Sequence, residues 1–376
     1  MRGCHVMAKP ASARCNLHCR YCFYLGKNQQ ARMDDVTLEA FIQQHIAEQP
    51  GDVVEFSWQG GEPLLAGLPF YQKVVALQRR YAAGKQIQNS IQTNGTLLNE
   101  EWCHFLHANK WLVGISIDGP IDLHDCYRVT RGGKPTHHRV VAAIELLRAF
   151  GIEFNLLVVV SKQNCAQPER LYHYLTTLGT PFLQFIPLVE KDEQGEITPE
   201  SVSEEGFGAF LNAIFDLWVR KDIGNVFVQI FDSTLGVWCG HSSQMCSFST
   251  TCGHAFALES NGDLYQCDHY VYPEHKLGNI HSIPITTLNH SQKAVRFGED
   301  KQRRLVMECQ MCPVLRFCQG DCPKHRIRQG KSYLCKSYYA FFTHTSPYMR
   351  MMYELIEHRR SPVELMKILA VSRNAE

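Results

Sequence analysis

The first residues in this sequence that could do chemistry are three cysteines at the spacing C-x3-C-x2-C, namely Cys15, Cys19 and Cys22. Three thiolates on one short loop can hold three irons of a [4Fe–4S] cluster, which normally takes four cysteines. The fourth iron would then bind a small molecule, much as a catalytic metal keeps one position open. Taken alone, the same spacing would also suit a zinc knuckle or a buried group of thiols.

A second group of cysteines fills the last third of the chain. Asn261-Gly262 is typical of a hairpin turn, and this hairpin would bring Cys252 and Cys267 close together. A C-x2-C-x5-C-x3-C pattern follows, and the group provides enough thiolates for two fully ligated clusters. Zinc would fit C-x2-C pairs equally well. We favour iron–sulfur clusters here, because further clusters could serve the open cluster predicted upstream. The group consists of Cys246, Cys252, Cys267, Cys309, Cys312, Cys318, Cys322 and Cys335.

Length and charge narrow the class of protein. A chain of 376 residues predicts one large domain plus a smaller one. A net charge of +1 gives no reason to expect nucleic acid or an anionic membrane as partner. No apolar run approaches the ~18 residues of a membrane span, and the N-terminus lacks the apolar core of a signal peptide. We therefore expect a cytoplasmic enzyme whose clustered cysteines serve metal or redox chemistry rather than disulfides.

Alternating strands and helices must position these residues. Strand, helix, strand, repeated along the first half, predicts a parallel α/β architecture, a partial (β/α)6 TIM-like barrel. Polar or glycine-rich residues follow the strands, at the carboxyl ends where such barrels place their chemistry. We expect strands over 4–8, 53–58, 87–92, 112–117, 154–160 and 182–186, and helices over 35–47, 68–81, 100–109, 140–150, 169–178 and 207–220. A further strand is expected over 226–231.

We expect the barrel to span 1–235, a cysteine-rich domain 236–345, and a C-terminal helical segment 346–376. The chemistry-bearing segments after the first four strands would converge on one mouth of the barrel. They are the cysteine loop, Gly60-Gly61-Glu62-Pro63, Gln92 to Asn94, and Ser116 to Gly119.

Two patterns resemble a known enzyme group. The Cys15, Cys19 and Cys22 loop with Phe23 resembles the signature of radical S-adenosylmethionine (SAM) enzymes, and the later cysteines resemble the SPASM domain appended to many of them. Within that group the chain looks like the anaerobic sulfatase-maturating enzymes, which oxidise a cysteine or serine of a target sulfatase to Cα-formylglycine. The segments that carry this likeness are Lys9-Pro10, Cys22-Phe23-Tyr24, Trp58 to Pro63, Gln92 to Gly95, and Cys267-Asp268.

The resemblance implies three [4Fe–4S] clusters and bound SAM, with a ligand set for each. Cys15, Cys19 and Cys22 would hold the SAM-binding cluster. Cys246, Cys252, Cys267 and Cys322 would hold one auxiliary cluster, and Cys309, Cys312, Cys318 and Cys335 the other. Spacing alone would have placed Cys322 in the second set.

The resemblance also implies how SAM is held. Its amine would meet Gly60, Gly61 and Glu62, and its carboxylate Arg128, although Arg131 and Arg139 are close by in sequence. Gln59, Ser116 and Leu188 would line the rest of the cofactor, and the Tyr21 backbone its adenine.

The implied reaction is abstraction of a Cβ hydrogen by a 5′-deoxyadenosyl radical, followed by proton removal and loss of an electron. Asp268 is the candidate base; a turn carboxylate that accepts backbone hydrogen bonds is the structural alternative. Tyr24 would face the same cavity or simply pack. The implied partners are a sulfatase segment of the type Cys/Ser-x-Pro/Ala-x-Arg and a reductant such as flavodoxin or ferredoxin.

Two alternatives stay open at this point. Another SPASM-type enzyme could form thioether or carbon–carbon crosslinks in a peptide with the same cysteines. Such enzymes commonly carry an N-terminal recognition domain, for which this chain has no room before its first strand, and Asp268 favours sulfatase maturation. A non-catalytic iron–sulfur electron carrier would leave Gly60-Gly61-Glu62-Pro63 unexplained.

Overall fold

The computed structural model describes residues 3–24 and 31–373. Contacts divide the chain into two compact units. The first unit contains residues 1–116, 124–154 and 252–300, and the second contains residues 117–123, 155–251 and 301–376. None of the described helices is long and apolar enough to cross a membrane.

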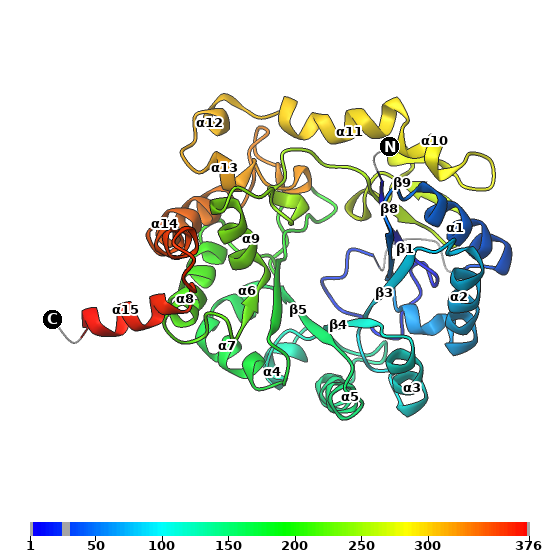
Figure 1. Cartoon of the computed structure of the whole chain (residues 1–376), viewed down its shortest axis with the longest axis horizontal. Coiled ribbons are helices and arrows are strands. Elements are labelled where there is room, and N and C mark those ends of the chain that lie inside the picture. Colours follow the sequence, from blue (N-terminus) through cyan, green and yellow to red (C-terminus); the bar gives the residue numbers. More distant parts are fainter. Residues whose placement is uncertain (1–2, 25–30, 374–376) are drawn as a thin grey trace. The chain divides into compact units, whose positions relative to one another are not determined.

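Four parallel strands form the centre of the first unit, and each runs into one of the predicted chemical segments. They lie in the order β1 (His5–Ala8), β2 (Val53–Trp58), β3 (Gln86–Thr93) and β4 (Leu112–Ser116). The connections carry the helices α1 (Asp35–Glu48), α2 (Leu68–Tyr81), α3 (Glu100–Ala108) and α5 (His137–Ala149). Figure 1 shows α1, α2 and α3 beside these strands. Strand–helix alternation is therefore confirmed, with bounds within a few residues of those predicted.

Aromatic side chains fill the space between this sheet and its helices. Trp58 is buried, and its ring stacks on Phe56 with centroids 6.1 Å apart. Phe41 from α1 meets both rings edge-on, and Tyr71 from α2 meets the Trp58 ring at 5.8 Å. Large buried rings of this kind dominate core energetics, so their packing fixes the positions of the neighbouring strand ends.

The predicted hairpin is present and extends the same sheet. Strands β8 (Ala255–Leu258) and β9 (Asp263–Tyr265) pair antiparallel, and Gly262 turns between them at φ +84°. Strand β10 (Lys276–Asn279) pairs with β9, while β8 pairs in parallel with β1. The pairing of β8 with β1 was not predicted, and it places part of the cysteine-rich segment beside the cysteine loop.

The second unit contains three parallel strands and most of the C-terminal helices. Strand β6 (Phe182–Pro187) lies between β5 (Phe154–Val160) and β7 (Phe227–Val228). Its longer helices are α7 (Pro168–Thr176), α8 (Gly206–Lys221), α9 (Gln229–Trp238), α14 (Cys335–Glu357) and α15 (Glu364–Arg373). The remaining helices of the chain are α4 (Ile121–His124), α6 (Lys162–Cys165), α10 (Ile285–Asn289), α11 (Gln292–Arg303), α12 (Met307–Gln310) and α13 (Leu315–Cys318), with short 3₁₀ turns at Pro63–Ala66, Cys246–Phe248, Asp268–Tyr270, Pro273–His275 and Pro323–His325.

Two features of the second unit differ from expectation. The predicted strand over 226–231 is confirmed only at Phe227–Val228, because pairing stops after Val228 and α9 begins at Gln229. Ile230, Phe231 and Thr234 are buried at helical spacing, which a short apolar run does not reveal in advance. The C-terminal helical segment was expected from residue 346, whereas α14 already begins at Cys335. The predicted domain boundaries remain a prediction.

Candidate active site

The loop that carries the first three cysteines follows β1 and is held by backbone hydrogen bonds. Residues 17–20 pair with residues 127–130 through an isolated antiparallel bridge and two backbone hydrogen bonds of 2.8 and 3.1 Å. The Cys22 N–H donates to the Cys19 carbonyl at 3.0 Å, which closes a turn between two predicted ligands. Because these contacts satisfy backbone groups within the protein, they fix the loop path without help from a cluster.

The other side of the loop rests on the glycine pair after β2. The Gly61 N–H donates to the Ser12 carbonyl at 2.7 Å, and the Glu62 N–H donates to the Arg14 carbonyl at 2.8 Å. A Cβ atom on Gly61 would lie 2.2 Å from the Arg14 oxygen, and Gly60 has φ +126°. Only glycine suits both positions, because the loop backbone lies directly against them.

Glu62 is completely buried and joins the ends of two strands. Its carboxylate accepts hydrogen bonds from the Thr93 hydroxyl at 2.7 Å, the Asn94 N–H at 2.9 Å and the Leu64 N–H at 3.0 Å. Burial raises the pKa of Glu62, and these hydrogen bonds oppose that rise. A carboxylate offers about four acceptor positions, so the three protein donors satisfy most of them, and the contact of Glu62 with the SAM amine remains a prediction.

Arg128 is the arginine that the fold places beside this loop. It is buried, whereas Arg131 and Arg139 are exposed. Burial raises the pKa of both the Cys15 thiol and the Glu62 carboxyl, and the Arg128 guanidinium acts in the opposite direction on both. A cation that acts on the cluster loop and on the buried carboxylate is suitably placed to meet an anionic group of a bound ligand.

The Asn94 side chain connects the end of β3 to the first cysteine. Its amide donates to the Asn16 side-chain oxygen at 3.0 Å and to the Cys15 sulfur at 3.8 Å. The Leu17 N–H also donates to the Cys15 sulfur, at 3.4 Å. Hydrogen bonds to a ligating sulfur are one way in which a protein sets the potential of an iron–sulfur cluster.

The other predicted SAM contacts are spread over both units. Tyr21, Gln59 and Ser116 lie in the first unit, where the Gln92 amide donates to the Ser116 hydroxyl at 3.0 Å. Leu188 lies in the second unit, buried directly after β6. Their contacts with SAM remain predictions.

Asp268 follows the hairpin and forms an ion pair with Lys9 at the end of β1. The Lys9 side chain is 2% exposed and the Asp268 side chain 21% exposed. The Lys9 ammonium also lies 3.7 Å from the centroid of the Tyr24 ring. The Tyr24 hydroxyl donates to Glu259, and burial, followed by that carboxylate, raises the pKa of Tyr24 so that the phenol stays protonated.

The predicted ligands of the first auxiliary cluster come from both units. Cys252 and Cys267 flank the β8–β9 hairpin in the first unit, while Cys246 and Cys322 belong to the second. The Cys246 loop is held by Lys301, whose ammonium donates to the carbonyls of Cys246 and Ser247 at 2.8 Å each. This ligand set remains a prediction.

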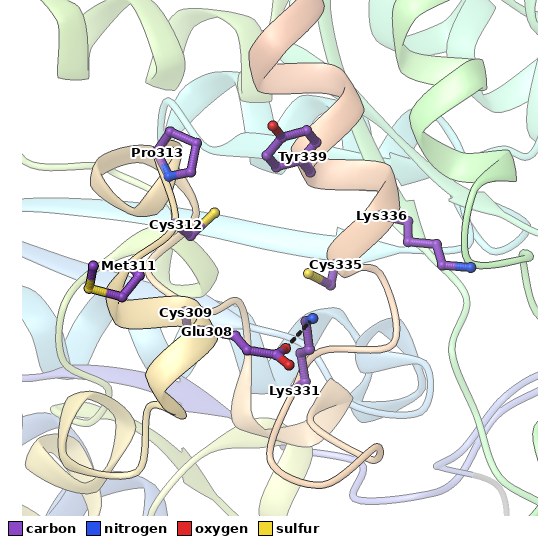
Figure 2. Close-up of a pocket in the computed structure, with 9 residues that line it drawn as sticks. All are labelled: Glu308, Cys309, Met311, Cys312, Pro313, Lys331, Cys335, Lys336 and Tyr339. Atoms are coloured by element: carbon purple, nitrogen blue, oxygen red, sulfur yellow. Dashed lines mark hydrogen bonds and ion pairs between the residues drawn. The ribbon is translucent and has the colours of Figure 1, made fainter.

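The predicted ligands of the second auxiliary cluster all belong to the second unit, and three of them line one cavity. Cys309, Cys312 and Cys335 line a cavity of about 450 Å³. Figure 2 shows the sulfurs of Cys312 and Cys335 directed into the space between α14 and the segment around Cys312. The Cys318 thiol is half-buried and interacts electrostatically with Cys309 and Cys335. Three of the four predicted ligands therefore line one volume, and the four cysteines fit the donor set of a cubane cluster.

Cluster assembly must remove protons from these thiols. Burial raises the pKa of Cys15, Cys309 and Cys335, so each thiol is protonated near neutral pH. Only the thiolate binds metal, and binding therefore releases protons. Among the residues described here, no three Cys, His, Asp or Glu side chains converge closely enough to hold a single metal ion.

Sequence reasoning missed the partners of the predicted residues. It identified Asp268 but not its ion pair with Lys9, and Tyr24 but not its bond to Glu259. It also overlooked Lys301. A lysine at the end of an apolar strand was the available signal for Lys9, because a buried ammonium requires a partner.

Comparison with known proteins places these sites in a family. Residues 10–175 match the model of the radical SAM superfamily, and residues 246–313 match the SPASM model, an iron–sulfur cluster-binding domain. A serine-type anaerobic sulfatase-maturating enzyme of Bacteroides thetaiotaomicron is 42% identical over 97% of this chain and 95% of its own length. A cysteine-type enzyme of Clostridium perfringens is 36% identical over 91% of this chain and 96% of its own length.

Solved structures agree with the sequence relatives. The structure described as native anSMEcpe with bound AdoMet matches 93% of this chain and 99% of its own, with 34% identity and a TM-score of 0.87. The same protein with bound AdoMet and the Cp18Cys peptide matches with the same identity and TM-score. This α/β fold, with its three-cysteine loop and SPASM domain, defines a radical SAM oxidoreductase that uses SAM and iron–sulfur clusters. Within that class, the chain belongs to the family of anaerobic sulfatase-maturating enzymes.

Proposed function

We propose that this chain oxidises a cysteine or serine side chain of a sulfatase to Cα-formylglycine. Support comes from relatives of both the serine type and the cysteine type that match nearly its whole length. The observation that carries the proposal is Asp268, a carboxylate directly after the predicted ligand Cys267 and fixed by a buried lysine in the unit that holds the cysteine loop. A proton acceptor at that place suits an oxidation that must remove a thiol or hydroxyl proton.

The residues around the loop would hold the cofactors in the following way. Cys15, Cys19 and Cys22 would ligate the SAM-binding cluster, Glu62 and its glycines would meet the SAM amine, and Arg128 the SAM carboxylate. When bound, the clusters and SAM supply a 5′-deoxyadenosyl radical and a route for the departing electron. The auxiliary sets would be Cys246, Cys252, Cys267 and Cys322, and Cys309, Cys312, Cys318 and Cys335.

The protein's own side chains would manage the proton and the position of the substrate. Asp268 would accept the thiol or hydroxyl proton as the Cβ–H bond is lost. Tyr24, kept protonated by burial and by Glu259, would pack beside the reacting carbon rather than act as a base. The substrate would be a segment of the type Cys/Ser-x-Pro/Ala-x-Arg, and a flavodoxin or ferredoxin would supply electrons.

The test is anaerobic reconstitution with iron and sulfide, followed by reduction and addition of SAM with a Cys-x-Pro-x-Arg or Ser-x-Pro-x-Arg peptide. The mass of the peptide and the yield of 5′-deoxyadenosine are followed together. Conversion to formylglycine lowers the mass by about 18 Da for cysteine and about 2 Da for serine, by elemental arithmetic on this chemistry.

The outcomes separate the alternatives. SAM cleavage with the expected mass loss would support the proposal, and the two peptides would rank cysteine against serine. SAM cleavage that leaves both peptides unchanged would overturn sulfatase maturation and favour a crosslinking enzyme. A new mass loss of about 2 Da without an aldehyde that reacts with hydrazine would also indicate crosslinking, since that reaction likewise removes two hydrogens.

A further inference from the structure

Lys9 lies where three chemically important segments of the first unit meet. Its backbone N–H donates to the Leu258 carbonyl at 2.9 Å, at the end of the β1–β8 pairing. Its ammonium pairs with Asp268 and lies 3.7 Å from the centroid of the Tyr24 ring. A Cβ atom on Gly60 would lie 3.2 Å from the Lys9 Cβ, so the lysine stem packs against the glycine pair.

Burial makes the position of this ammonium specific. The Lys9 side chain is 2% exposed, and a buried charge is costly unless it is paired and hydrogen-bonded. The aromatic face of Tyr24 and the Asp268 carboxylate meet that requirement together. The stem is held between neighbouring strands, so the ammonium has little freedom to follow Asp268 elsewhere.

The Tyr24 ring that covers the ammonium is itself fixed. Its hydroxyl donates to Glu259, and Glu259 also accepts from the Ser12 hydroxyl at 2.8 Å. Glu259 is 1% exposed and follows β8, whereas Ser12 belongs to the cysteine loop. Lys9 thus holds Asp268 against a rigid frame that includes the cysteine loop, while Asp268 retains partial access to solvent.

We propose that Lys9 is the residue that positions the Asp268 carboxylate for proton removal from the substrate side chain. This inference rests on the proposed function. A purely structural ion pair would attach the hairpin to β1 without any effect on the course of the reaction, and the experiment below distinguishes the two roles.

The step that depends on Lys9 balances as follows. The Cβ–H bond of the substrate breaks and its hydrogen atom forms a C–H bond in 5′-deoxyadenosine. The thiol or hydroxyl proton passes to an Asp268 oxygen, one electron leaves to an oxidised iron–sulfur cluster, and a C=S or C=O bond forms. The thioaldehyde from cysteine then exchanges sulfur for oxygen with water and releases hydrogen sulfide. Without Lys9 the hydrogen atom is still taken, but the proton acceptor is misplaced.

The variants for the test are Lys9→Met, Lys9→Arg and the double variant Lys9→Met/Asp268→Asn. Lys9→Met keeps the length of the stem and removes the charge, and Lys9→Arg keeps a cation. The double variant removes both charges, so it shows whether an unpaired Asp268 disturbs folding. Lys73→Met is the matched control, because Lys73 pairs with Asp35 on the exposed surface of the same unit.

Each variant is reconstituted and four quantities are measured: iron per chain, the change in the cluster's electron paramagnetic resonance spectrum on adding SAM, 5′-deoxyadenosine, and formylglycine. A serine peptide deuterated at Cβ reports hydrogen abstraction through deuterium in 5′-deoxyadenosine. For Lys9→Met we expect a normal iron content, a normal SAM response and normal deuterium transfer. The yield of formylglycine per 5′-deoxyadenosine should fall about tenfold, which is less than the roughly 10²–10⁴-fold rate that a general base contributes. Lys9→Arg should recover most of this loss, and Lys73→Met should match the parent enzyme.

An unchanged ratio of formylglycine to 5′-deoxyadenosine in Lys9→Met would overturn the inference and leave a structural ion pair. Loss of the SAM response with full iron would overturn it as well, because Lys9 would then serve the cofactor. If Lys9→Met loses iron but the double variant does not, the iron loss comes from the unpaired Asp268 carboxylate, and Lys9→Arg then provides the test. A ratio of formylglycine to 5′-deoxyadenosine in Lys9→Arg as low as the ratio in an Asp268→Asn variant would contradict a positioning role for the cation. Failure of the parent enzyme to form formylglycine would instead count against the proposed function.

Discussion

At the scale of single residues, Asp268 is the most informative position. Asp268→Asn keeps the size of the side chain and removes its ability to accept a proton. We expect formylglycine to fall by roughly 10²–10⁴-fold, with 5′-deoxyadenosine still formed and iron per chain unchanged. Mass spectrometry of the peptide and chromatography of the nucleoside measure both products.

The control for that substitution is Asp35→Asn, since Asp35 on α1 forms an exposed ion pair with Lys73 on α2. This control should behave as the parent enzyme does. Equal formylglycine yields from Asp268→Asn and the parent would remove Asp268 from the mechanism and support the alternative of a carboxylate that only shapes the turn.

Residue types and spacings predicted the chemistry of this site better than its contacts. The cysteines could be proposed as ligands because their local spacing is the signal, and Asp268 could be proposed because the resemblance implies a carboxylate directly after Cys267. The ion pair between Lys9 and Asp268 joins residues 259 positions apart, and no local pattern encodes such a distance. The resemblance already named Arg128, and the fold adds that Arg128 is buried while Arg131 and Arg139 are exposed, a difference that the local sequence does not show.

At the scale of elements, the contact between the cysteine loop and the glycine pair should be sensitive to a single methyl group. In Gly61→Ala the added carbon would lie 2.2 Å from the Arg14 oxygen, so the loop must move. Overpacking of this kind costs about 1–3 kcal/mol, and a displaced loop should lose its cluster. We expect iron per reconstituted chain to fall by about four.

Gly51→Ala is the matched control for Gly61→Ala. Nothing lies within 4 Å of a Cβ atom at Gly51, which precedes β2. Its iron content and SAM cleavage should equal those of the parent enzyme. Full iron in Gly61→Ala would show that the loop does not depend on this contact.

Helix α1 carries a buried titratable group that should make stability depend on pH. Burial lowers the pKa of His45 to about 4, and its Nε2 lies 2.9 Å from the Glu55 carbonyl. In the unfolded chain the same imidazole protonates near ~6.5. Between these values the unfolded state binds a proton that the native state does not, so His45 reduces stability as the pH falls, by up to about 1.4 kcal/mol per pH unit.

We therefore expect the melting temperature of His45→Gln to fall less than that of the parent enzyme when the pH is lowered from about 7 to about 5. Differential scanning calorimetry of both proteins under the same anaerobic conditions measures this difference. His107→Gln, at an exposed position near the end of α3, is the control and should follow the parent curve. Parallel curves for His45→Gln and the parent would rule out His45 as the source.

The elements themselves were largely predictable, and the exceptions have physical causes. Apart from the polar β3, strands β1 to β6 are largely apolar runs, most of them followed by glycine, proline or polar residues, and such punctuation is local. The segment around Phe231 is apolar enough for either a strand or a helix, and its packing in α9 decided the outcome. The pairing of β8 with β1 joins distant parts of the chain, which no periodicity records.

At the scale of the whole molecule, each predicted cluster should be removable separately. Cys15→Ser in the first unit and Cys312→Ser in the second each remove one ligand of a different predicted cluster. If the chain binds three [4Fe–4S] clusters, iron should fall from about twelve to about eight per chain in each variant. Cys15→Ser should abolish the SAM-induced change in the paramagnetic spectrum, whereas Cys312→Ser should retain it.

Cys239→Ser serves as the control, because Cys239 lies at the end of α9 outside every predicted ligand set. Its iron content should equal that of the parent enzyme. Retention of all iron in Cys312→Ser would mean that the cavity lined by Cys309, Cys312 and Cys335 does not hold a cluster.

The place of β1 between β2 and β8 also has a consequence for the order of events on the ribosome. Strand β1 is among the first residues made, but its partner β8 begins at Ala255. At about 5–20 residues per second, one edge of β1 stays uncovered for roughly 10–50 s. An open strand edge invites pairing with other chains. The strand that leads into the cysteine loop is thus exposed until the last third of the chain emerges, which makes the nascent protein most vulnerable to aggregation in that interval.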